Sequence, residues 1–233
     1  MSKIDLHGVV DILPPEKEKY SKAFLIGKEA FIDAYNIFMD PDFQSKKDWR
    51  VEIDNENVKI HSKHYPFGNV FALKASLPAT MEVAFEESYN NFENMSTWNS
   101  NICYTQIVTR LSEHADIIHY ANPDVMIVKS RDYVVGRLWR KIGEELFCAA
   151  RSVELDDIPE TSNRVRGRLH LGCGKFTPDK LNPNITHVEY VLCIDLKGYI
   201  PKAIINAVMG KMMVKDFEET LKRYQDIAAD SQK

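Results

Sequence analysis

Arg137 is the residue whose setting most directly implies chemistry. In the segment RDYVVGRLWR, a β-strand would place Arg137 on the same face as Tyr133, Val135 and Trp139, because alternate side chains of a strand share a face. A guanidinium among these side chains would lose most of its hydration and would need a partner. If that partner is the polar end of a ligand, a hydrogen bond from the charged donor would contribute about 1.5 to 3 kcal/mol and would orient the ligand.

Asp216 is a second polar residue in an apolar setting. It follows Met209 by seven positions and Met213 by three, which places all three on one stripe of a helix. Arg110, on a predicted strand, could pair with Asp216 and tie that strand to the helix. A solvated Asp216 at the edge of the helix is the alternative.

Residues that could support catalysis or bind a metal do not form a recognisable pattern. His170 alternates with arginines on a polar strand face, Cys148 lies in an apolar strand, and neither has a nucleophile and base signature beside it. The sequence contains no G-x-S-x-G, H-E-x-x-H or phosphate-binding glycine motif, and its 4 cysteines form no C-x-x-C pair. We therefore expect a protein without enzymatic activity, bound metal or cofactor.

The spacing of apolar residues predicts the elements that would position these side chains. An apolar stripe within 17–39 indicates an amphipathic helix, and a shorter helix is expected near 81–89. Alternating apolar residues indicate strands separated by turns, such as the turn at 55–57. The predicted strands are 49–54, 58–65, 69–77, 102–111, 115–121, 131–142, 145–155, 165–176 and 186–196.

This order has no alternating strand and helix units, so it predicts an α+β protein with an antiparallel sheet. Nine antiparallel strands twist, and the curved sheet would need a cover on its concave face. The long helix predicted after Pro201 could provide that cover, since Met209, Met213 and Phe217 share its apolar stripe. The methionines could fill an ordinary core. Alternatively they form a lid over a cavity, because unbranched methionine side chains adapt to a guest.

Size and charge limit the classes of protein. A chain of 233 residues with 44% hydrophobic residues can bury one full core, and we expect one domain at 17–229 with an extension at 1–16 and a tail at 230–233. The formal net charge of −4 disfavours nucleic acid as a partner. We find no signal peptide and no apolar run long enough to span a bilayer, so we expect a cytoplasmic protein.

Four segments resemble the START family, the lipid transfer domains related to steroidogenic acute regulatory protein. They are Trp98-Asn99, QIVTRL at 106–111, SRDYVVGRLWR at 130–140 and DLKGYIPKAIIN at 195–206, and the last is the most specific. The resemblance is nearest to the sterol-binding steroidogenic and metastatic-lymph-node proteins, with the insect carotenoid-binding protein close to them. It implies a helix-grip fold, in which a curved nine-stranded sheet wraps round the C-terminal helix and encloses one lipid.

The resemblance also implies positions for ligand contacts. Met95 and Asn99 match pocket positions of the sterol-binding relatives, although a turn or cap would also explain the asparagine. In those relatives the arginine matching Arg137 is paired with an acid on the preceding strand, and the matching position here is Ala121, so Arg137 would lack that partner. Another acid, water and backbone carbonyls, or the polar end of the ligand would then serve instead. The candidate ligand-binding residues are therefore Met95, Asn99, Arg110, Ala121, Tyr133, Val135, Arg137, Trp139, Met209, Met213, Asp216 and Phe217.

The segment 122–130 would be the mobile loop that admits ligand together with the last helix. Its tip, 125–128, is apolar. The tip could make transient contact with a membrane surface, or it could pack beneath the helix.

We therefore expect a carrier that binds one apolar isoprenoid, a sterol or a carotenoid, and transfers it between membranes. Apolar burial at about 25 cal/mol per Å² would set the affinity. A sterol fits a closed tunnel, whereas a carotenoid is longer and would protrude. Two other functions stay open: a lipid-gated interaction module that uses the charged segment 151–168, and a helix-grip enzyme.

Overall fold

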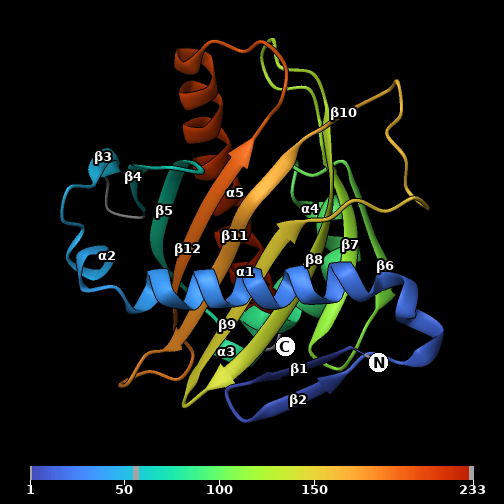
Figure 1. The fold of residues 1–233 in the computed structure, drawn as a ribbon. Helices are drawn as coiled ribbons and strands as arrows, with labels where there is room; N and C mark the ends of the chain where they lie inside the picture. Colours follow the sequence, from blue (N-terminus) through green and yellow to red (C-terminus); the bar gives the residue numbers. More distant parts are fainter. Residues whose placement is uncertain (1, 55–57, 231–233) are drawn as a thin grey trace.

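The computed structural model describes residues 2–54 and 58–230 and shows one large β-sheet with a long helix on each face (Figure 1). Met1, the predicted turn at 55–57 and residues 231–233 of the predicted tail lie outside the described residues. The strands are β1 (Lys3–Leu6), β2 (Val9–Ile12), β3 (Arg50–Asp54), β4 (Lys59–Tyr65), β5 (Gly68–Leu77), β6 (Tyr104–Arg110), β7 (Ala115–Asn122), β8 (Arg131–Ile142), β9 (Glu145–Ser152), β10 (Val165–Arg166), β11 (Arg168–Pro178) and β12 (Thr186–Asp195). The helices are η1 (Pro15–Tyr20), α1 (Ser21–Met39), α2 (Pro41–Ser45), α3 (Met81–Phe85), η2 (Glu86–Asn90), η3 (Phe92–Asn94), α4 (Met95–Trp98) and α5 (Lys202–Asp230).

Nine strands lie side by side in the order β3-β4-β5-β12-β11-β9-β8-β7-β6, each antiparallel to its neighbours. The α+β helix-grip prediction is therefore confirmed. The predicted strand 165–176 is divided into β10, which pairs parallel with β8, and β11. The division falls at Gly167, where the ring of Tyr133 leaves no room for a side chain: a Cβ there would lie 2.2 Å from a ring carbon.

The helix predicted at 17–39 is confirmed as η1 followed by α1, which crosses the outer face of the sheet (Figure 1). Phe24, Phe31 and Phe38 recur every seven residues and are buried against that face. Gly136 in β8 lets the helix approach closely, because a Cβ there would lie 2.9 Å from the carbonyl oxygen of Ala23.

A hairpin that the sequence analysis did not predict precedes this helix. Strands β1 and β2 pair antiparallel around a two-residue turn, His7 and Gly8, both of which have positive φ, as hairpin turns of this length require. Asp11 of β2 accepts a 2.6 Å hydrogen bond from Nη2 of Arg140, and both side chains are buried. Ile4 and Leu13 are also fully buried in the cluster on the outer face, so the hairpin within the predicted extension 1–16 is anchored to the rest of the fold.

The short helices lie between β5 and β6. The helix predicted near 81–89 is α3, continued by one π-helical turn, η2, and η3 and α4 then lead to β6. The carboxylate of Glu93 accepts a hydrogen bond from the backbone N–H of Ile107 at 3.0 Å. The backbone carbonyl of Glu93 accepts a second one from the Thr105 hydroxyl at 2.8 Å. These helices therefore cover the exposed edge of β6 and bring α4 to the inner face of the sheet.

The last helix, α5, begins directly after Pro201, as predicted, and lies against the inner face (Figure 1). Met209, Met213, Phe217 and Tyr224 are buried in one cluster with inner-face residues of the sheet, so the predicted apolar stripe faces it. Within the described residues, no helix, α5 included, is long and apolar enough to cross a membrane.

Candidate ligand-binding cavity

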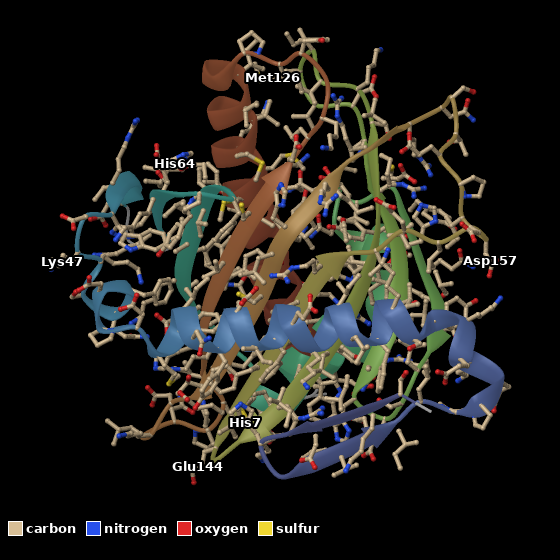
Figure 2. The ribbon with its side chains drawn as sticks, in the orientation of Figure 1. His7, Lys47, His64, Met126, Glu144 and Asp157 are labelled. Carbon is tan, nitrogen blue, oxygen red and sulfur yellow. The ribbon has the colours of Figure 1, made fainter. Side chains whose placement is uncertain are left out.

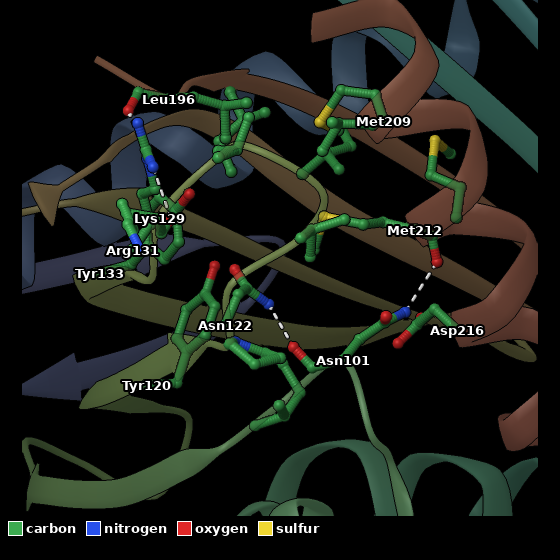
Figure 3. A pocket seen from close by; sticks show the side chains of 18 of the residues that line it. Asn101, Tyr120, Asn122, Lys129, Arg131, Tyr133, Leu196, Met209, Met212 and Asp216 are labelled. Atoms are coloured by element: carbon green, nitrogen blue, oxygen red, sulfur yellow. Dashed lines mark hydrogen bonds between the residues drawn. The ribbon is translucent and has the colours of Figure 1, made fainter. Parts of the chain in front are cut away.

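Two adjoining cavities lie between the inner face of the sheet and α5. The larger cavity, about 290 Å³, extends from the middle of β9, β11 and β12 to η2 and α4. The smaller cavity, about 140 Å³, lies between the β7–β8 loop and the first half of α5 (Figure 3). Five residues belong to the walls of both cavities, and we call this set the junction: Leu73, Ile102, Tyr120, Tyr190 and Asp216.

Small residues on the inner face of the central strands leave the larger cavity open. Ala75 in β5, Ala150 in β9, and Gly172 and Gly174 in β11 line its floor. A Cβ on Gly174 would lie only 3.2 Å from the ring of Phe176, so even one added carbon would crowd the wall. The local sequence thus forms a continuous sheet that has too few side-chain atoms to fill the space under α5.

Arg137 lies on the inner face with Tyr133 and Val135, as the strand alternation predicts, and it lines the larger cavity. Its partner is Asp116, directly opposite in β7: Nε donates to Oδ1 at 2.8 Å and Nη2 to Oδ2 at 2.7 Å. Nη2 also donates to the carbonyl of Tyr89 at 3.0 Å. Burial by itself would lower the pKa of Arg137, but the charge of Asp116 more than reverses this and raises it.

The prediction that Ala121 occupies the position of the acid partner is therefore wrong. The acid is present at Asp116, five residues earlier in the same strand, and an odd separation places two residues on opposite faces. Ile118 and Tyr120, at even separations from Asp116, line the cavities, whereas Ala121 is opposite Asp132 and fully buried away from them.

The predicted pair of Arg110 and Asp216 does not form. Arg110 donates to Oδ2 of Asp116 at 2.8 Å, so two arginines share that carboxylate. Asp216 instead accepts a 2.6 Å hydrogen bond from the Asn99 amide. Asp216 keeps accessible surface, as the solvated alternative predicts, and it lines both cavities. Burial raises the pKa of Asp216, and the hydrogen bond from Asn99 only partly offsets this rise.

A chain of hydrogen bonds ties the β7–β8 loop region to α5 beside the smaller cavity (Figure 3). The Asn122 amide donates to the carbonyl of Asn101 at 2.6 Å, and the Asn101 amide donates to the carbonyl of Met212 at 2.8 Å. The apolar tip of the loop is partly buried and partly exposed. Val128 is buried against α5, whereas Met126 and Ile127 are 62% and 73% exposed.

The structure brings nine of the twelve predicted site residues to the cavity walls. Trp139 shares the face of Arg137 but packs among Phe85, Tyr89 and His114 instead of lining a cavity. Arg110 and Ala121 are likewise outside the walls. The nine at the walls are Met95, Asn99, Tyr133, Val135, Arg137, Met209, Met213, Asp216 and Phe217.

Sequence reasoning missed two tyrosines of the junction, Tyr120 and Tyr190. Val188, Tyr190, Leu192 and Ile194 alternate along β12 and all line a cavity, so the period of two in the last strand was a signal that could have found Tyr190. The signal was incomplete because alternation does not state which set of side chains faces inward.

The two residues considered for catalysis do not form a reactive site. Cys148 lines the larger cavity, but burial raises the pKa of its thiol to about 12, which keeps it protonated. Burial lowers the pKa of His170, which lies outside both cavities. Among the described residues, no three His, Cys, Asp or Glu side chains cluster closely enough to hold a metal ion.

Comparison with known proteins identifies the family to which the chain belongs. The chain is 33% identical over 228 residues to Steroidogenic acute regulatory-like protein 1 of Caenorhabditis elegans, covering 97% of this chain and 88% of that protein. It is 31% identical over 217 residues to the mitochondrial Steroidogenic acute regulatory protein of Danio rerio, covering 90% and 74%. The fold is similar to that of human StAR-related lipid transfer protein 5, with a TM-score of 0.79 at 16% identity over 90% of this chain and 99% of that one. The START domain model matches residues 31–229, and the chain therefore belongs to the START domain family.

Proposed function

We propose that this protein is a carrier that binds one sterol-sized isoprenoid lipid in the two adjoining cavities and transfers it between membranes. The observation that carries the proposal is a space between the sheet and α5 whose walls are mostly apolar side chains with a few polar groups, the usual construction of a lipid site. Membership of the START family supports it. So do the names of the similar proteins, which are steroidogenic regulators and a lipid transfer protein.

Affinity in such a carrier comes from apolar burial. Removing apolar surface from water contributes about 25 cal/mol per Å², so a rigid isoprenoid skeleton outweighs any single hydrogen bond of about 1 kcal/mol. The polar groups on the walls would then select the orientation of the lipid. This division of roles is the reason for proposing binding and release without chemical change.

A carotenoid is the second candidate ligand. The two cavities share the five junction residues, and a longer molecule could extend through both of them. A sterol remains the first candidate because the curated relatives are steroidogenic proteins.

Release would take place at the end of the molecule that carries the β7–β8 loop. Met126 lies there beside the connection that leads into α5 (Figure 2). The exposed pair Met126 and Ile127 could enter the apolar part of a membrane surface while the buried Val128 keeps the loop attached to α5.

The test is to purify the protein from a lipid-rich source, extract it, and read the absorbance and mass of what it holds. A sterol mass without colour is the expected result, and visible absorption would identify a carotenoid instead. The purified protein should also move a sterol from donor to acceptor vesicles faster than the uncatalysed rate. Absence of any bound lipid together with absence of transfer would contradict the carrier function.

A further inference from the structure

Polar side chains make up three of the five residues of the junction. Of its five residues, Tyr120, Tyr190 and Asp216 carry polar groups, and they come from β7, β12 and α5 (Figure 3 shows Tyr120 and Asp216). Tyr190 belongs to a central strand of the sheet and still has 36% of its surface accessible, because that surface faces the cavities. Side chains from the sheet and from the covering helix therefore present polar groups to one place.

These three groups have unused hydrogen-bonding capacity. Asp216 accepts one hydrogen bond, on Oδ1 from Asn99. Its Oδ2 and the hydroxyls of Tyr120 and Tyr190 have no hydrogen bond to any other described residue, and all three residues line both cavities. A group on a ligand could therefore bond to them without breaking a contact within the protein.

Arg137 and Asp116 are in the opposite situation. The guanidinium donates to both oxygens of Asp116 and to the carbonyls of Tyr89 and Ser88. Asp116 receives a further bond from Arg110. The pair satisfies itself inside the fold, so a ligand hydroxyl would gain little by approaching it.

We propose that Tyr120, Tyr190 and Asp216 form the site that hydrogen-bonds the polar group of the ligand, and that the ion pair of Arg137 serves the fold. This inference rests on the proposed carrier function and names the ligand class more closely: an isoprenoid with a hydroxyl or keto oxygen that reaches the junction. The skeleton of that ligand would then extend from the junction into the larger cavity, past the glycines of β11, and the ligand would reach the junction through the smaller cavity.

The electrostatics of the junction agree with a neutral oxygen group as its partner. Burial raises the pKa of Asp216, and a carboxyl group accepts a hydrogen bond from a ligand hydroxyl whether or not it holds a proton. Burial raises the pKa of Tyr120, and the charge of Asp216 raises it further. Burial also raises the pKa of Tyr190, and the charges of Tyr120 and Asp216 add to that rise. The two tyrosine hydroxyls thus remain neutral hydrogen-bonding partners, and Asp216 lies close enough to influence both of them.

The test is a competition between two lipids that differ only in the polar group. The protein is incubated with equal amounts of cholesterol and cholest-5-ene, which lacks the hydroxyl, both delivered from cyclodextrin, and the bound lipids are extracted and counted by mass. One hydrogen bond to a ligand hydroxyl corresponds to a preference of about tenfold for cholesterol. Uptake of neither lipid would contradict the carrier function itself, whereas equal uptake of both would overturn only the polar site.

Variants then locate the preference. Asp216→Leu should reduce the ratio of bound cholesterol to cholest-5-ene at least about fivefold, and Asp216→Asn, which keeps the hydrogen-bonding groups, should retain most of it. Tyr120→Phe and Tyr190→Phe each remove only a hydroxyl and should lower the ratio about twofold to fivefold, so the test does not depend on one variant folding. The matched control is Glu218→Leu, an exposed acid on α5 outside both cavities.

Two results would overturn the assignment. One is an unchanged ratio in Asp216→Leu and in both tyrosine variants. The other is loss of the ratio in a folded double variant Asp116→Leu/Arg137→Met, since this would place the recognition of the hydroxyl at the arginine.

Discussion

The carboxylate of Asp116 binds the guanidinium of Arg137 through two parallel hydrogen bonds of 2.8 and 2.7 Å, across the β7–β8 pair. Both side chains are buried, and Arg137 forms part of the wall of the larger cavity. The guanidinium is thus held by groups of the protein itself, as the proposal of a separate polar site for the ligand requires.

Removing one member of this pair should destabilise the protein. Arg137→Met leaves Asp116 charged and buried with only the half-exposed Arg110 beside it. We expect the free energy of unfolding, measured by urea unfolding, to fall by about 3 to 5 kcal/mol. The double variant Asp116→Leu/Arg137→Met should regain most of that loss, because it removes both charges. A single variant within about 1 kcal/mol of the wild type would contradict this account.

The hairpin of β1 and β2 should contribute to stability through Asp11. Its carboxylate binds Nη2 of Arg140, which has no accessible surface, and Nδ1 of His114 at 3.0 Å. Asp11→Ala leaves the arginine buried without its acid, and we expect a loss of about 3 to 5 kcal/mol by urea unfolding. Asp5→Ala, an exposed acid in the same hairpin, is the control and should change stability by less than about 1 kcal/mol.

Filling the smaller cavity should block ligand uptake. Met209 and Met213 line it from α5. Replacing both with Trp adds side-chain volume that would fill the cavity. Overpacking costs about 1 to 3 kcal/mol of stability, so the fold should survive. Uptake of cholesterol should fall at least about tenfold. Met39→Trp, on the exposed side of α1, is the control for the added indole. Normal uptake by the double Trp variant would show that the ligand does not use this cavity.

The exposed loop residues should affect transfer and leave binding intact. Met126→Ser/Ile127→Ser removes the apolar groups that protrude at the loop end of the molecule, and we expect transfer between vesicles to slow about tenfold. Uptake of cholesterol from cyclodextrin should be unchanged, because neither residue lines a cavity. Leu181→Ser, in the turn between β11 and β12 and 96% exposed, controls for loss of a surface apolar group. Equal transfer rates in all three proteins would remove the loop from the mechanism.

Stability should depend on pH through Asp216. Because burial raises its pKa above 3.8, the folded protein binds the proton more tightly than the unfolded chain does. Stability from this group is therefore present below about pH 4 and is lost as the pH rises through the folded pKa. Asp216→Asn cannot lose a proton, so its stability relative to the wild type should increase from pH 4 to pH 7, as measured by urea unfolding across that range. Parallel profiles for the two proteins would contradict the raised pKa.

The local pattern of apolar residues was sufficient to predict most of the helices and strands. The periods of the apolar residues predicted the nine main strands, the helix at 17–39 and the helix after Pro201, because each pattern depends only on which face of one element is buried. The same reasoning placed Arg137 and Asp216 on inward faces. It missed the β1–β2 hairpin, although His7-Gly8 between two apolar pairs was a turn signal, since strands of four residues show little alternation.

The partners of those residues were decided only by tertiary structure. A strand pairs in one register, and the register determines that Arg137 meets Asp116 while Ala121 faces the other side of the sheet. Asp216 bonds to Asn99 and shares the cavity walls with two tyrosines because α5 crosses the sheet at one particular place, which no pattern within α5 encodes. The cavity has the same origin, since Ala75, Ala150 and the two glycines Gly172 and Gly174 lie on three strands that come together only in the folded sheet.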